Sequence, residues 1–123
     1  MPNPAAILIV DDDREVRSVL ARMLEVGGYR VFEAANGKEA VTEARKHPVD
    51  LLITDLIMPE QEGIETIKLL RREYPGLKII AISGAFGGDF LMVAGYLGAA
   101  ETLQKPLRMD VVLQTVERIL KPE

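Results

Sequence analysis

Five short strand-like runs, each separated from the next by a segment of helical period, are the feature that most limits what this chain can fold into. The runs cover residues 5–10, 29–34, 51–54, 77–82 and 101–104. Between them, apolar residues recur every three or four positions, as they do on one face of an α-helix. Strands that alternate with helices form βαβ units, in which the strands are parallel and the crossovers right-handed. The pattern therefore predicts an α/β fold built on a parallel sheet.

The polarity of the runs predicts their order in the sheet. Runs 5–10, 51–54 and 77–82 are almost wholly apolar, which is typical of strands covered by helices on both faces. The other two runs contain charged and polar residues, as edge strands do. These constraints favour a doubly wound (βα)5 architecture with strand order 2-1-3-4-5. We expect one domain over residues 1–123, with its core at 6–121.

Polar residues follow four of the five predicted strands at the point where each strand ends. Residues 11–13 are all aspartate, Asp55 follows the third run, Ser83 the fourth and Lys105 the fifth. Doubly wound sheets bind their ligands beyond the carboxyl ends of the strands, where the winding reverses. We therefore expect these side chains to share one crevice.

The residue types in this crevice indicate a particular chemistry. Two carboxylates about 5 Å apart repel each other by roughly 3 kcal/mol at an effective dielectric constant near 20, so a cation or a proton is needed to hold them together. The chain has no cysteine and one histidine, His47, which leaves an all-oxygen ligand set. Such a set prefers Mg²⁺. A lysine and a hydroxyl beside a spare carboxylate are typical of phosphoryl transfer to an aspartate.

Other polar residues have a structural interpretation. Asp13 is expected to be the N-cap of the first helix, and Asn36 the N-cap of the second, with Glu39 in the position of a capping box. The glycine pair at 27–28 is expected to end the first helix. His47, next to a proline, is interpreted as a solvated residue that closes the second helix.

Four motifs in order resemble those of response regulator receiver domains, the CheY-like superfamily of two-component signal transduction. They are Val10-Asp11-Asp12, the segment from Leu51 to Pro59 that contains Asp55, Ile82-Ser83-Gly84, and Gln104-Lys105-Pro106-Leu107. The resemblance covers residues 6–121. It implies a flavodoxin-like fold and a regulatory domain, which is not an enzyme beyond its own phosphorylation and dephosphorylation.

The resemblance also implies how the acidic residues are used. Asp55 would accept the phosphoryl group. Asp12 and Asp55 would bind Mg²⁺ directly, with Mn²⁺ as a substitute ion, and the backbone carbonyl of Ile57 would be a third ligand. Asp11 would act through a metal-bound water.

Four further positions take their roles from the same resemblance. Ser83 would donate a hydrogen bond to the phosphoryl group, and Lys105 would form an ion pair with it. The peptide bond between Lys105 and Pro106 is often cis in the family. Thr102 stands where receiver domains usually carry an aromatic residue, whose rotation reports phosphorylation to the outer face. The familiar coupling from serine to aromatic residue is therefore not expected in its usual form.

The implied partners are a histidine kinase or phosphotransfer protein as phosphodonor, and a downstream effector that the sequence does not identify. The expected output face consists of the fourth helix, the fifth strand and the fifth helix. There, Met92, Tyr96 and Met109 are interpreted either as exposed apolar surface or as part of the core. A homodimer through this face is a further expectation.

Charge and hydropathy argue against other classes of partner. The formal net charge is −4, so direct binding to nucleic acid or to an anionic membrane is not expected. No apolar run approaches the length of a membrane span, and residues 1–4 lack the basic start of an export signal. We expect a cytoplasmic protein.

Two alternative functions remain at this point. The first is a pseudo-receiver, a binding module that no longer uses phosphorylation, for which Thr102 is the supporting feature. The second is a haloacid-dehalogenase-like phosphatase with Asp11 as its nucleophile, because residues 7–13 also show an apolar strand followed by Asp-x-Asp. Glu15 lies where those enzymes carry Thr or Val, and Asp55 would then have no role.

Overall fold

Five parallel strands form one sheet in the computed structural model, in the order β2-β1-β3-β4-β5. The structure describes residues 4–55, 62–84 and 94–121. The strands are β1 (Ala6–Val10), β2 (Arg30–Ala34), β3 (Leu51–Asp55), β4 (Lys78–Ser83) and β5 (Glu101–Gln104). This confirms the doubly wound order that the polarity of the runs predicts.

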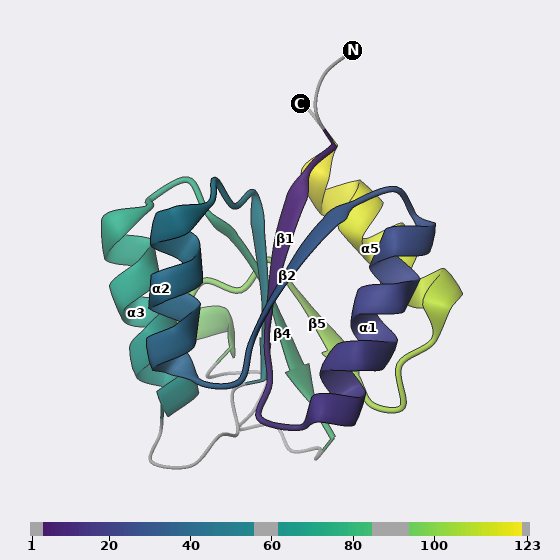
Figure 1. The fold of residues 1–123 in the computed structure, drawn as a ribbon, viewed down its shortest axis with the longest axis horizontal. Helices are drawn as coiled ribbons and strands as arrows, with labels where there is room; N and C mark the ends of the chain where they lie inside the picture. The colour runs from purple at the N-terminus through teal and green to yellow at the C-terminus, as the bar shows by residue number, and fades with distance from the viewer. Residues whose placement is uncertain (1–3, 56–61, 85–93, 122–123) are drawn as a thin grey trace.

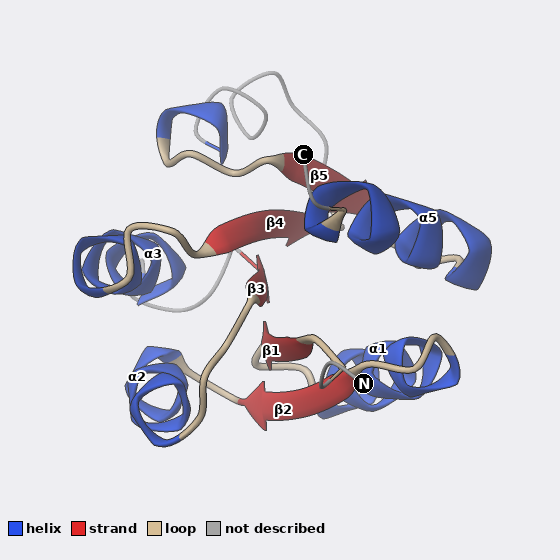
Figure 2. Cartoon of the chain, turned by 90° about the horizontal axis from the view of Figure 1, so that it is seen from above, coloured by secondary structure: helices blue, strands red, loops and turns tan. Residues whose placement is uncertain are grey.

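Helices cover both faces of the sheet. They are α1 (Arg14–Val26), α2 (Gly37–Lys46), α3 (Glu62–Glu73) and α5 (Met109–Leu120). Helices α1 and α5 lie on one face, and α2 and α3 on the other (Figure 1). Seen from above, β2 and β5 form the two edges of the sheet (Figure 2). Between β4 and β5, the described residues are helical only at 94–96, and this short piece carries no label.

Strands β3 and β4 differ slightly in extent from their predicted runs. β3 includes Asp55 as its last residue, and β4 starts and ends one residue later than expected, at Lys78 and Ser83. The physical reason is hydrogen bonding. The N–H of Leu77 donates to the carbonyl of Tyr74 in the turn after α3, at 3.0 Å, and Ser83 is paired in the ladder with Gln104.

The core is divided by the sheet into two apolar clusters. The cluster under α2 and α3 is built around Leu8, Leu52 and Leu70, and the cluster under α1 and α5 around Ile9, Ile53 and other residues that alternate with the first set along the strands. Successive side chains of a strand point to opposite faces, so each central strand contributes to both clusters. This explains why β1, β3 and β4 are apolar throughout.

Local capping follows the predicted pattern closely. The side chain of Asp13 accepts hydrogen bonds from two N–H groups in the first turn of α1, and that of Asn36 accepts from the N–H of Glu39 at 2.8 Å. The carboxylate of Glu39 accepts from the N–H of Ala35, one residue before the N-cap, at 3.1 Å. Gly28, the residue after the C-cap Gly27 of α1, has φ of 91°, which only glycine adopts without strain.

His47 is the C-cap of α2, as expected, and its ring packs on another side chain. Its N–H donates to the carbonyl of Glu43 at 3.1 Å. Its imidazole stacks on the ring of Phe32, with centroids 4.1 Å apart and planes 13° from parallel. The side chain is 39% exposed, so the prediction of a solvated residue holds in part, and the difference is that β2 provides an aromatic surface for one face of the ring. Over the described ranges, no helix has the length and apolar character needed to cross a membrane.

Candidate functional site

The register of the sheet aligns the carboxyl ends of the strands that precede the predicted site residues. Val10 is paired with Thr54, so Asp11 and Asp55 come next on adjacent strands. Ser83 is paired with Gln104, so Lys105 follows directly. Parallel strands all end at the same edge of a sheet, which brings these four positions together as predicted.

Alternation along the strands decides which face the side chains take. Ile9 and Ile53 belong to the cluster under α1 and α5, and Asp11 and Asp55 lie two residues further on. Leu103 belongs to the same cluster, and Lys105 follows it by two. With the side-chain period of two, both carboxylates and the ammonium group point to one face of the sheet. The distances from the Lys105 ammonium group to the two carboxylates agree with this.

Three carboxylates form a tight cluster at this edge. One oxygen each from Asp11, Asp12 and Asp55 lies within 4.8 Å of the other two. Asp11 is 0% exposed and Asp55 is 5% exposed, whereas Asp12 lies at the surface. The Nζ atom of Lys105 bridges the two buried groups, at 3.3 Å from Oδ2 of Asp11 and 3.2 Å from Oδ2 of Asp55.

The carboxylate of Asp11 is held by both of its oxygens. Its Oδ1 accepts a hydrogen bond from the N–H of Asp13 at 2.8 Å. Its Oδ2 is buried and accepts no well-aligned hydrogen bond within the described part of the chain, where the Lys105 ammonium group faces it as an ion pair at 3.3 Å. Burial raises the pKa of the Asp11 carboxyl, and the neighbouring Asp55 adds to the rise, although the Asp13 N–H and the Lys105 ammonium oppose it.

Lys105 has the opposite balance of effects. Partial burial lowers the pKa of its ammonium group, but the carboxylates of Asp11 and Asp55 together outweigh burial and raise that pKa above its ordinary value. Lys105 is therefore a firmly held positive charge between two negative ones. It remains 25% exposed, so water and small anions can reach it.

The donor set of this cluster fits a hard divalent cation. All three ligating groups are carboxylates, and one buried oxygen, Oδ2 of Asp11, is held only by its ion pair with Lys105 at 3.3 Å. A cation such as Mg²⁺ prefers oxygen ligands and retains several waters, which the exposed side of the cluster at Asp12 permits. The residues present therefore match the ion that the sequence predicts.

Ser83 and the Lys105–Pro106 peptide complete the described site. Ser83 is 1% exposed, and its carbonyl accepts a hydrogen bond from the N–H of Lys105 at 3.0 Å, which fixes the start of the loop that carries the lysine. The Lys105–Pro106 bond is cis, as the resemblance implies. Thr102 is an exposed residue of the edge strand β5, paired with Ala81.

Some predicted positions lie outside the described residues. They include Ile57, the expected carbonyl ligand, and Met92 on the expected output face. Tyr96 and Met109 on that face are 85% and 46% exposed. The interpretation of these two residues as core is therefore wrong, because both are exposed to solvent.

Arg17 is a site-supporting residue that the sequence reasoning missed. Its Nη1 donates to the backbone carbonyl of Asp11 at 2.6 Å, and its Nε lies 3.5 Å from a carboxylate oxygen of Glu33. The side chain is only 15% exposed although it belongs to a helix that faces solvent. An arginine one turn into a helix, shortly after three aspartates, is the sequence signal that could have indicated this contact.

Comparison with known proteins gives consistent matches. A family model described as the response regulator receiver domain matches residues 7–117. The response regulator GtcR of Aneurinibacillus migulanus is 39% identical over 113 residues, which are 92% of this chain and 45% of that protein. The response regulator receiver protein CpdR of Brucella abortus is 32% identical over 114 residues, which are 93% of this chain and 95% of that protein. The chain thus spans less than half of the first relative and nearly all of the second.

A solved structure gives the same result for the fold. The chemotaxis protein CheY4 of Vibrio cholerae superposes with a TM-score of 0.89 and 31% sequence identity, over 95% of this chain and 99% of that chain. The likeness in fold therefore extends over almost the whole of both chains.

Proposed function

This chain belongs to the response regulator receiver domain family of two-component systems, and from that membership we propose that it is a phosphorylation-controlled switch with Asp55 as its phosphoacceptor. The observation that carries the proposal is the position of the Asp55 carboxylate. Its Oδ2 lies 3.2 Å from the Lys105 ammonium group, and a carboxylate oxygen of the residue lies within 4.8 Å of one from Asp11 and one from Asp12. Asp55 is the member of the cluster that ends a central strand, and its carboxylate lies beside both the lysine and the other two acids.

The proposed donor is a phosphohistidine on a kinase or a phosphotransfer protein. A carboxylate oxygen of Asp55 attacks the phosphorus atom, so that a P–O bond forms and the P–N bond breaks. The electron pair of the broken bond stays on the imidazole nitrogen, which takes up a proton. Lys105 faces the developing charge on the phosphoryl oxygens, and Ser83 is proposed to donate its hydroxyl hydrogen to one of them.

Asp11, Asp12 and Asp55 would hold Mg²⁺, or Mn²⁺ in its place, with the Ile57 carbonyl as a further ligand. When bound, the ion supplies positive charge that stabilises the phosphoryl oxygens during transfer. The protein contributes the placement of the acids. Asp11 is fixed by the Asp13 N–H at 2.8 Å, which keeps its second oxygen turned toward Lys105 and the cluster.

Phosphorylation would change the charge at this edge of the sheet. A phosphoryl group brings extra negative charge and three acceptor oxygens. Lys105 would shift its ion pair from Asp11 toward the new group. Ser83 would move with it, because the carbonyl of Ser83 accepts a hydrogen bond from the N–H of Lys105. We propose that the readout is the face formed by the helical segment before β5, by β5 and by α5, where Tyr96 and Met109 are exposed. An effector, or a second copy of the chain, would bind there.

Beryllofluoride with Mg²⁺ tests whether this site accepts a phosphoryl analogue. We expect amide chemical shifts to change around Asp55, Ser83 and Lys105 when both are added, and not when Mg²⁺ is left out. The Asp55→Asn variant is the control and should not respond. A wild-type spectrum that stays unchanged would favour the pseudo-receiver and overturn the proposal.

Mapping of the phosphorylated residue separates the proposal from the phosphatase alternative. After incubation with phosphoramidate and Mg²⁺, mass spectrometry should place one phosphoryl group on Asp55. The alternative with Asp11 as nucleophile is not supported, because the family match is to receiver domains and Asp11 is wholly buried beside Lys105. A phosphoryl group found on Asp11 instead would support the phosphatase alternative and contradict the proposal.

We further propose a cytoplasmic location and a single domain over residues 1–123.

A further inference from the structure

A partly open cavity of about 290 Å³ lies between the C-terminal ends of α2 and α3, away from the acidic cluster. Its inner wall includes the buried side chains of Leu8 and Leu52, which are 1% and 0% exposed. Val49 and Leu77, which lie just before β3 and β4, also line it. The cavity therefore lies toward the amino ends of these strands, whereas the carboxylates lie at their carboxyl ends.

One polar atom in this apolar surrounding is poorly satisfied. The carbonyl of Ala44 lies in the last turn of α2, and its usual helical donor would be the N–H of residue 48. That residue is Pro48, which has no N–H. The hydroxyl of Tyr74 donates to the Ala44 carbonyl instead, at 3.4 Å, which is long for a hydrogen bond between oxygens. The acceptor therefore retains capacity for a better donor.

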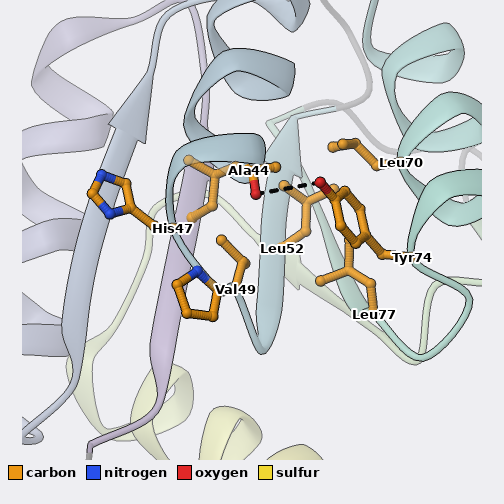
Figure 3. A pocket seen from close by; sticks show the side chains of 9 residues that line it. Ala44, His47, Val49, Leu52, Leu70, Tyr74 and Leu77 are labelled. Atoms are coloured by element: carbon orange, nitrogen blue, oxygen red, sulfur yellow. Dashed lines mark hydrogen bonds between the residues drawn. The ribbon is translucent and has the colours of Figure 1, made fainter.

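The arrangement of the side chains leaves this acceptor accessible from the cavity. Figure 3 shows the Tyr74 ring reaching across to the Ala44 carbonyl, with Leu52 and Leu77 beside it. His47 lies on the other side of Val49 from Tyr74, and its ring is already stacked on Phe32 (Figure 3). The imidazole is thus engaged elsewhere, and the carbonyl is the polar feature that a ligand in this cavity would meet.

The size of the cavity indicates the size of its ligand. An engineered apolar cavity of about 150 Å³ accommodates benzene, and typical ligand pockets begin at about 300 Å³. The volume of about 290 Å³ is therefore suited to a molecule of one or two fused rings. The Tyr74 ring provides an aromatic surface against which a flat ligand can pack.

We infer that this cavity is a binding site for a small, flat, uncharged molecule with an apolar body and one N–H or O–H donor, in the chemical class of indoles and phenols. The apolar body would contact Leu8, Leu52 and Tyr74, and the donor would bind the Ala44 carbonyl. The site is independent of the acidic cluster, so the inference does not rest on the proposed phosphorylation.

Titration of the full chain with indole, followed by methyl NMR, tests the inference. We expect the methyl signals of Leu8, Ala44 and Leu52 to shift with a dissociation constant of about 0.1–1 mM, as for a fragment of this size. Methyl signals of Leu103 and Val112, on the opposite face of the sheet, should not move. If the cavity methyls do not shift up to the solubility limit of indole, the inference is wrong.

A matched ligand tests the role of the carbonyl. Benzofuran has the shape of indole without the N–H, and we expect it to bind about 2- to 10-fold more weakly. In the Tyr74→Phe variant, the Ala44 carbonyl loses its present donor, so indole should bind more tightly relative to benzofuran than in the wild type. Equal affinity for the two ligands in both proteins would overturn the assignment of the donor.

Two cavity-filling variants test the location. Ala44→Leu and Val49→Phe each place additional carbon atoms in the cavity and should weaken indole binding at least about tenfold. Thr42→Leu, which adds an apolar side chain at an exposed position of the same helix, should leave binding unchanged. The dispersion of the amide spectrum verifies that each variant is folded. A folded filled variant that binds indole as the wild type does would contradict the proposed site.

Discussion

Replacing Asp11 by asparagine should stabilise the protein in the absence of divalent ions and weaken the stabilisation that Mg²⁺ provides. Asparagine has the shape of aspartate, and its amide oxygen can still accept the Asp13 N–H that now lies 2.8 Å from Oδ1 of Asp11. The substitution therefore removes a buried negative charge while it preserves the local hydrogen bond. The change in stability reports what that charge costs.

The contacts allow the electrostatic terms to be compared. At an effective dielectric constant near 20, the pair between Asp11 and Lys105 at 3.3 Å contributes an attraction of about 5 kcal/mol. Repulsion from Asp55, whose nearest cluster oxygen lies within 4.8 Å, is at least about 3.5 kcal/mol, and Asp12 adds to it. These terms largely cancel. What remains is the desolvation of a wholly buried carboxylate, so we expect the variant to be more stable by about 1–2 kcal/mol.

The sign of the pH dependence follows from the raised pKa of the Asp11 carboxyl. A carboxyl whose pKa is higher in the folded state than in the unfolded state favours folding below the unfolded value, about 3.9, and this contribution is lost as the pH rises through the folded value. The advantage of Asp11→Asn should therefore be absent near pH 4 and below, and should develop as the pH rises above it. In excess Mg²⁺ the wild type should become the more stable of the two proteins, because it offers the ion one more negative ligand than Asp11→Asn does.

Urea unfolding followed by far-ultraviolet circular dichroism is suited to the measurement, since the chain has no tryptophan. The wild type and Asp11→Asn are compared at neutral pH in a chelator and in excess Mg²⁺. Asp110→Asn, which changes an exposed aspartate paired with Arg108 at 3.0 Å, is the control and should show no dependence on Mg²⁺. If Asp11→Asn is the less stable protein in chelator, or if both proteins gain equally from Mg²⁺, the reasoning is refuted.

Four further substitutions give distinct expectations, all measurable by the same unfolding assay. Lys105→Met should destabilise the ion-free protein by about 2 kcal/mol, between the values for surface and buried pairs. Because the pKa of Lys105 is raised, this difference should persist through neutral pH and disappear as the pH rises into the alkaline range where the ammonium group loses its proton. Gly98→Ala should cost about 2 kcal/mol or more, since φ is 86° and the new methyl group would overlap Arg71, whereas Gly28→Ala, with φ of 91° in open space, should cost about 1 kcal/mol. Asn36→Ala should cost about 1 kcal/mol through loss of the α2 cap, and a cost near zero would show that the cap is dispensable.

The sequence was sufficient to predict the sheet and the meeting of its acidic residues. Apolar character in three strands and polar character in two is a direct consequence of burial, and parallel strands necessarily end at one edge. For this reason the ends of the predicted strands are sufficient to bring Asp11, Asp55 and Lys105 together. Their roles in phosphoryl transfer remain predictions.

Contacts that depend on side-chain reach could not be predicted in this way. Arg17 bonds to the carbonyl of Asp11 because of its particular conformation, and no periodicity encodes that. The stacking of His47 on Phe32 depends on the approach of a helix end to an edge strand. The cavity beside Tyr74 arises because Ala44 and Val49 are small where longer side chains would fill the space.

The two apolar clusters on opposite sides of the sheet share no residue. The acids and Lys105 belong to the side of α1 and α5, whereas the cavity belongs to the side of α2 and α3. Substitutions on the two sides are therefore separated by a layer of hydrogen-bonded backbone, and their effects on stability should add. Side chains on the α2–α3 side can therefore change the shape of the cavity without altering the acidic cluster at which phosphorylation is proposed.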